Sequence, residues 1–151
     1  MAKVDLNLLK KLRIETSASI ADCNKALSDT ENDYKKALDW IKKRGLEKAE
    51  KKSDRETGQG IVEAYIHNGG KIGVLLTLLC ETDFVAKTDE FKSLAHEVAM
   101  QISAMNPKDV PALLKQEYIR DGSQTIEQMV KSAIGKLGEN ITVKDFKRFE
   151  I

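Results

Sequence analysis

Cysteine and histidine are scarce in this sequence, with two of each among 151 residues. Two cysteines, Cys23 and Cys80, are too few for a disulfide-rich scaffold or a cysteine-based zinc site. The histidines, His67 and His96, lie far apart in the chain, and neither has a second ligand at metal-site spacing. We therefore expect no metal site, two small core cysteines and two surface histidines.

Long apolar runs are missing as well. The longest, residues 72–80, is interrupted by Gly73 and Thr77 and is far shorter than the roughly 20 residues that span a bilayer. Residues 1–5 carry no apolar signal core. Together with the low cysteine count, this predicts a soluble protein of the reducing cytoplasm with no membrane partner.

Neither sign of charge is in excess, since 25 Lys and Arg face 24 Asp and Glu. A general nucleic-acid binder usually shows a strong basic excess, so we expect no direct nucleic-acid partner. The balance is nevertheless uneven along the chain. Residues 1–55 carry 14 basic and 10 acidic side chains, whereas residues 56–151 carry 11 and 14. The overall neutrality therefore hides a basic front and a mildly acidic body.

Signatures of enzyme chemistry are absent. The sequence has no glycine-rich phosphate loop ending in Lys and Ser or Thr, no dinucleotide fingerprint and no Gly-x-Ser-x-Gly elbow. We therefore expect a protein that is not an enzyme, with no catalytic residue and no cofactor. We also expect the chain to bind no nucleotide itself.

Helical periodicity dominates the first 45 residues. Apolar residues recur at helical spacing in three runs: Leu6, Leu9 and Leu12; Ile20, Cys23 and Leu27; Tyr34, Ala37, Leu38 and Ile41. Ser19 is a suitable cap for the second helix, Asp29 or Asn32 for the third, and Gly45 is placed to end the third. Because each helix is too short to be stable alone, residues 1–45 are predicted to form a packed three-helix module.

The next stretch, residues 46–60, is mostly charged and ends in Gly58 and Gly60. This composition predicts a solvated helical extension or linker, and hence a module boundary. A nucleic-acid patch is the alternative, although acidic residues interleave the basic ones.

From residue 61 the periodicity changes to that of strands. Residues 61–67 and 71–80 are rich in β-branched and other apolar side chains, and they flank Asn68-Gly69-Gly70, which tolerates positive φ. The pattern predicts a hairpin whose second strand is buried on both faces.

Helical stripes return further along the chain. Apolar spacing predicts helices over residues 91–105 and 126–137, while residues 107–124 are irregular apart from a short helix near residues 112–117. The tail, residues 141–151, is predicted to be a third strand. Residues 61–151 should therefore form an α+β core in which a small antiparallel sheet packs against helices.

Asp83 and Phe84 form an unusual pair between the buried strand and the following helix. Phe84 could fold back onto that helix as a hydrophobic staple. Alternatively, it could project as an aromatic anchor beside a carboxylate, a kind of group that dominates protein interfaces. The local pattern leaves both interpretations open.

Several motifs occur in a fixed order along the chain. They are Leu12-Arg13-x-x-Thr16 with Asp22-Cys23-x-Lys25-Ala26-Leu27, Thr82-Asp83-Phe84-Val85-Ala86, Ile134-Gly135-Lys136-Leu137-Gly138-Glu139-Asn140-Ile141, and Arg148-Phe149-Glu150. In this order they resemble the bacterial elongation factor Ts family, the guanine-nucleotide exchange factors of the GTPase elongation factor Tu. The resemblance is collinear from about Leu6 to Glu150.

The resemblance implies two contacts with elongation factor Tu. A ubiquitin-associated-like module would dock on the GTPase through four matching positions, Lys10, Arg13, Ile20 and Ala21. A second contact would be made by Thr82, Asp83, Phe84 and Val85. In that contact Phe84 would wedge apolar surface into the partner, and Asp83 would perturb hydrogen bonding near its Mg²⁺. Losing the metal removes charge neutralisation at the β-phosphate, so GDP would leave faster.

The chain also departs from the family pattern. Thr16-Ser17-Ala18-Ser19 replaces a Thr-Gly-x-Gly turn, Ala21 replaces a bulky apolar residue, and Lys144-Asp145 replaces paired arginines. The sequence has room for one core subdomain, where longer members have two. A homodimer that restores the second half is therefore expected.

Two other functions are compatible with parts of the sequence. The three-helix module alone could serve a ubiquitin-associated-like peptide- or protein-binding adaptor without exchange activity, which leaves residues 61–151 unexplained. The basic stretch over residues 35–55 could serve an RNA-associated protein, for which binding should be salt-sensitive.

Overall fold

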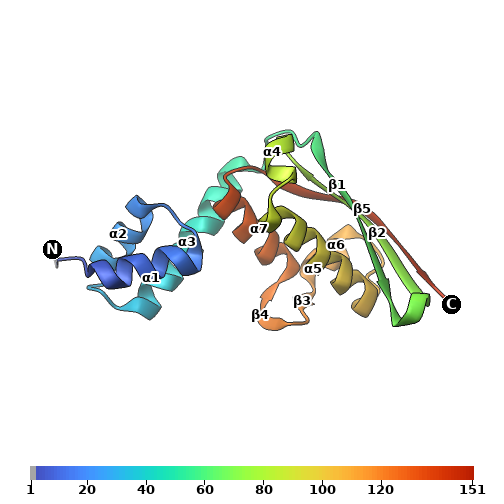
Figure 1. Cartoon of the computed structure of the whole chain (residues 1–151), viewed down its shortest axis with the longest axis horizontal. Helices are drawn as coiled ribbons and strands as arrows, with labels where there is room; N and C mark the ends of the chain where they lie inside the picture. Colours follow the sequence, from blue (N-terminus) through green and yellow to red (C-terminus); the bar gives the residue numbers. More distant parts are fainter. Residues whose placement is uncertain (1–2) are drawn as a thin grey trace.

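The computed structural model describes residues 3–151, which form a helical module and an α+β core joined by one long helix (Figure 1). Met1 and Ala2, the first residues of the expected 1–45 module, lie outside the described part. The module contains α1 (Leu6–Thr16), α2 (Ile20–Asp29) and the first half of α3 (Tyr34–Lys52). The predicted fold class, a three-helix module followed by a small antiparallel sheet on helices, is confirmed.

The module encloses a small core of its own. Its buried residues are Leu12, Cys23, Ala26, Leu27, Ala37 and Ile41. Ser19 caps α2 as predicted, since its hydroxyl accepts a hydrogen bond from the Asp22 amide. The cap of α3 is Asp33 instead of Asp29 or Asn32. Asn32 takes a positive φ of 62° in the turn, so Asp33 is the extended residue from which the helix starts.

Gly45 does not end the third helix, contrary to the sequence prediction. The helix continues to Lys52, and a Cβ added to Gly135 of α7 would meet the Gly45 Cα at 2.8 Å. Gly45 is therefore an interior residue of α3, and the missing Cβ of Gly135 allows the two helices to cross closely at this point. Beyond the crossing, Ala49 is buried in the core of the second unit. The charged 46–60 stretch thus begins as a packed helix.

The core contains one main sheet and several helices. Its elements are β1 (Gln59–His67), η1 (Asn68–Gly70), β2 (Ile72–Cys80), α4 (Asp83–Ala86), α5 (Asp89–Met105), α6 (Val110–Lys115), β3 (Glu117–Tyr118), β4 (Asp121–Thr125), α7 (Ile126–Leu137) and β5 (Ile141–Glu150). The strand order is β1-β2-β5, antiparallel throughout. The predicted short helix corresponds to α6, but part of the stretch predicted to be irregular forms the β3-β4 hairpin.

Helices cover only one face of the main sheet. Figure 1 shows α5, α6 and α7 on the same side of β1, β2 and β5. On β2 the side chains alternate, with Val74 and Leu76 buried and Leu75 51% exposed. The prediction that this strand is buried on both faces is therefore wrong, because no element within residues 3–151 packs against its outer side. The register places four exposed apolar residues on that side, which we call the open sheet face: Val62, Ile66, Leu75 and Phe149.

None of the helices within residues 3–151 has the length and apolar content required to cross a bilayer.

Candidate functional site

The Asp83-Phe84 pair lies in a one-turn helix, α4, and not in a loop. Thr82 caps this helix, because its hydroxyl oxygen accepts from the Val85 amide at 3.4 Å. Phe84 is 88% exposed, so the staple interpretation is wrong. The aromatic ring that fills the core is instead Phe91, which is fully buried in α5.

The inner side of α4 fixes which way its outer side faces. Ala86 is buried and Val85 is half-buried against the core. Asp83 and Phe84 are both exposed, and the Asp83 carboxylate forms a 2.5 Å ion pair with Lys87 one turn later. The helix therefore presents a carboxylate and an apolar ring to solvent side by side.

Glu139, in the connection between α7 and β5, anchors the start of α4. Its carboxylate accepts two hydrogen bonds from Thr82, one from the backbone amide at 3.0 Å and one from the hydroxyl at 2.7 Å. In the opposite direction, the Glu81 carboxylate accepts from the Asn140 amide at 2.8 Å. Sequence reasoning used Glu139 and Asn140 only as parts of a motif. Their role depends on a contact 57 residues away in the chain, which no local pattern reveals.

The second set of predicted site residues lies on the module. Lys10 and Arg13 are exposed on α1, and Ile20 and Ala21 are exposed at the start of α2. Two further apolar residues of α1 lie beside them, and the sequence did not predict them as contact residues. Leu6 is 67% exposed and Ile14 83% exposed. Residues 6, 10, 13 and 14 share one helix face by their spacing. The exposure of Ile14 could have been predicted, because Ile14 does not belong to the apolar stripe of the first helix.

The turn between α1 and α2 forms without glycine. Ser17 adopts the left-handed region with φ 54° and ψ 15°. The Thr16 hydroxyl donates to the Leu12 carbonyl at 2.7 Å and accepts from the Ala18 amide at 3.2 Å. These local bonds hold the turn that presents Ile20.

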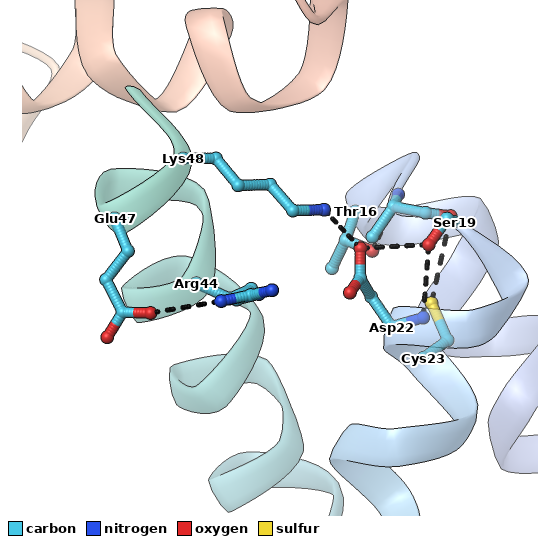
Figure 2. Close-up of polar contacts among 8 residues, drawn as sticks. Thr16, Ser19, Asp22, Cys23, Arg44, Glu47 and Lys48 are labelled. Carbon is cyan, nitrogen blue, oxygen red and sulfur yellow. Dashed lines mark hydrogen bonds and ion pairs between the residues drawn. The ribbon is translucent and has the colours of Figure 1, made fainter. Parts of the chain in front are cut away.

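A cleft of about 420 Å³ separates the module from α7. At its edge, Lys48 of α3 reaches across to Asp22 of α2, with Nζ and Oδ2 2.5 Å apart (Figure 2). The Ser19 hydroxyl also donates to Asp22, at 2.9 Å. The Lys48 bond, with help from Ser19, lowers the pKa of the Asp22 carboxyl below its usual range. This ion pair links α2 to the half of α3 that packs into the core.

The two cysteines and the two histidines lie in contrasting environments. Cys23 and Cys80 are fully buried, as predicted, and burial raises the pKa of each thiol, which disfavours the reactive thiolate. His67 and His96 are exposed and both contact the Tyr65 ring. Within residues 3–151 no cluster of three or more His, Cys, Asp or Glu residues is arranged to hold a metal ion.

Comparisons with known proteins point to one family. The family model described as Elongation factor TS matches residues 81–151. Elongation factor Ts of Nostoc sp. is 44% identical over 151 residues, which cover 100% of this chain and 48% of that protein. Elongation factor Ts of Synechocystis sp. is 38% identical and that of Desulfosudis oleivorans 38% identical, each over 100% of this chain, and 90% and 99% of those proteins are covered.

The structure defines an α+β protein with a helical module in front and an aromatic side chain exposed on its core. The chain belongs to the elongation factor Ts family, a family of translation elongation factors. It spans about half the length of the Nostoc relative. The alignments with the other two relatives are 197 and 196 residues long although this chain has 151, so those relatives contain internal segments that this chain lacks.

Proposed function

We propose that this protein is a cytoplasmic guanine-nucleotide exchange factor that binds elongation factor Tu with GDP and promotes GDP release. The observation that carries the proposal is the exposure of Phe84, at 88%, beside the Asp83 carboxylate on a helix anchored to the core. An exposed aromatic ring costs hydration free energy unless a partner covers it, and such rings are frequent anchors of interfaces.

The mechanism assigns a separate task to each set of residues. The module docks first, with Lys10 and Arg13 supplying charge and Ile20 apolar surface. Phe84 then inserts into the GTPase and displaces side chains beside its Mg²⁺ site. Asp83 competes for hydrogen bonds that support the metal, and α4 keeps the two residues adjacent.

Nucleotide release follows from binding alone. This protein makes and breaks no covalent bond in the proposed reaction. Because it binds the nucleotide-free GTPase more tightly than the GDP form, GDP must bind the complex more weakly by the same factor. Loss of Mg²⁺ lowers the electrostatic stabilisation of the β-phosphate and thereby accelerates release.

We also propose that two chains pair through the open sheet face. Val62, Ile66, Leu75 and Phe149 lie on neighbouring strands and would be buried together in a symmetric sheet-on-sheet contact. Contiguous exposed apolar surface of this kind usually marks an interface. A two-fold axis through the face would make the contact self-complementary.

One experiment tests the exchange proposal. Elongation factor Tu is loaded with fluorescent GDP and chased with excess unlabelled GDP, with and without this protein. We expect a dose-dependent acceleration of the fluorescence decay. Binding to the GTPase without acceleration would instead support an adaptor built on the three-helix module, and the exchange proposal would be rejected.

A further inference from the structure

A one-turn helix cannot hold its own orientation. Four residues provide almost no internal hydrogen bonding, and isolated helices of this length are unstable in water. The direction in which Asp83 and Phe84 point is therefore set by the packing of Val85 and Ala86 against the core and by what holds the two ends of α4. At the far end, the Thr88 hydroxyl donates to the Val85 carbonyl at 2.7 Å. At the near end, the contacts come from Glu139.

Two dipeptides from distant parts of the chain hold one another at this near end. Glu81-Thr82 follows β2, and Glu139-Asn140 precedes β5. Each dipeptide supplies a carboxylate that accepts the backbone amide of the other. The Asn140 side chain also donates to the Arg55 carbonyl at 2.8 Å. The junction thus ties α4 to the first residues of β5 and to the segment after α3.

The second hydrogen bond from Thr82 to Glu139 also orients the Thr82 hydroxyl that caps α4. The Thr82 hydroxyl has a single proton, and Glu139 accepts it at 2.7 Å. The hydroxyl lone pairs are then free to face the Val85 amide inside α4. Without the carboxylate, the hydroxyl could rotate and the cap would be lost for part of the time.

We propose that Glu139 is a positioning residue for nucleotide exchange, which fixes α4 so that Asp83 and Phe84 meet the GTPase in one orientation. The inference rests on the exchange function proposed above. A group already ordered before binding loses less conformational entropy on insertion, so pre-organisation favours the productive complex. Glu139 need not touch the partner for this effect.

The test compares Glu139→Ala, Glu139→Gln, Phe84→Ala and the double variant Glu139→Ala/Phe84→Ala. The matched control is Glu127→Ala, which removes an exposed carboxylate from α7. We expect Glu139→Ala to slow stimulated GDP release about tenfold, as loss of hydrogen bonds to a charged group does. Glu139→Gln, which keeps one acceptor oxygen, should show a smaller loss, and the control should match wild type.

Two readouts separate positioning from general damage. Hydrogen exchange of the Thr82 amide should accelerate in Glu139→Ala, while amides of β2 and β5 keep their protection. The loss in the double variant should be smaller than the product of the two single losses, because the part of the positioning that concerns the ring matters only when the ring is present. If Glu139→Ala disturbs the whole fold, the same comparison is made with Glu139→Gln.

Three outcomes would overturn the inference. If Glu139→Ala stimulated GDP release as fast as wild type although hydrogen exchange at the Thr82 amide had accelerated, fixation of α4 would be unnecessary. Multiplicative losses in the double variant would show that Glu139 acts independently of Phe84. An unchanged Thr82 amide would show that Glu139 does not hold α4. A wild-type protein that fails to accelerate release rejects the exchange function instead, and the amide measurement still reports on Glu139.

Discussion

Phe84 and Phe91 differ completely in environment although only six residues separate them. Phe84 is almost fully exposed and Phe91 fully buried. Both belong to helices and both follow an acidic residue. The difference arises because α5 packs against the sheet, whereas α4 places only Val85 and Ala86 against the core. A projecting Phe84 thus depends on tertiary packing.

For Phe84→Ala we expect normal folding and a large loss of exchange activity. Removing an exposed ring changes little in the free protein, whereas truncating an interface anchor costs about 2 kcal/mol or more in binding. Stimulated GDP release should therefore fall at least about tenfold, with an unchanged thermal unfolding curve. Phe91→Ala is the matched control, and it should lose about 3–5 kcal/mol of unfolding free energy. Unfolding of Phe84→Ala would contradict the assignment.

Replacing Ser17 by glycine should stabilise the module. Ser17 has φ 54°, and a non-glycine residue in this left-handed region costs roughly 1–2 kcal/mol of folding free energy. Glycine avoids that cost, but it also raises the conformational entropy of the unfolded chain, which offsets part of the gain. We expect a net gain of about 0.5–1 kcal/mol, measured by urea unfolding. Ser53→Gly is the control: Ser53 has φ −59°, so that variant should lose stability.

At the scale of elements, the crossing of α3 and α7 brings together two glycines with unequal surroundings. A Cβ on Gly135 would lie 2.8 Å from the Gly45 Cα and 3.0 Å from its carbonyl oxygen. A Cβ on Gly45 would have no neighbour within 4 Å. The approach is therefore close on one side only.

These surroundings predict opposite effects of the same substitution. Gly135→Ala should destabilise the protein by about 1–3 kcal/mol, because backbone atoms must move to admit the methyl group. Gly45→Ala should stabilise it by up to about 1 kcal/mol, through the higher helix propensity of alanine. Chemical unfolding of the two variants measures the change in unfolding free energy for each, and the two changes should have opposite signs. Equal destabilisation by both would indicate a different crossing geometry.

The Asp22–Lys48 pair should make the stability of the module sensitive to acid. The native pKa of Asp22 lies below its unfolded value, so its contribution is present above about pH 4 and is lost as the pH falls through the native pKa. We expect Asp22→Asn to lose about 0.5–1 kcal/mol at pH 7. The difference from wild type should shrink by pH 3. Asp39→Asn, at an exposed position of α3, serves as the control in thermal unfolding at both pH values.

Local sequence patterns predicted the helices and strands better than they predicted the contacts between these elements. The apolar stripes of α5 and α7 and the strand character of β1, β2 and β5 follow from periodicity, which the sequence contains directly. The passage of α3 through Gly45 could not be predicted, because it depends on α7 crossing at that point. The exposure of Leu75 likewise depends on the absence of a covering layer. The anchoring of Thr82 by Glu139 needs two segments to meet in space.

At the scale of the whole molecule, the open sheet face predicts the oligomeric state. Leu75→Glu should convert a dimer to a monomer, because it places a charge in the middle of the proposed contact. The fold should survive, since Leu75 is about half exposed and Lys147 lies directly opposite in the register, where it can pair with the new carboxylate.

Light scattering at micromolar concentration measures this effect. Wild type should have twice the mass of one 16.9 kDa chain, and Leu75→Glu the mass of one chain. Ser123→Glu, an exposed position on β4, adds the same charge away from the face and should remain dimeric. A wild-type mass of one chain at all concentrations would reject pairing.

The continuity of α3 has a geometric consequence for the two proposed contacts. Because one helix contributes to the cores of both units, its length sets the separation between the docking residues and α4, and its twist sets their relative angle. Each residue inserted between Ile41 and Ala49 would shift the module by about 1.5 Å and rotate it by about 100°. A related protein could therefore keep both contacts on one rigid partner only if its helix differed by whole turns.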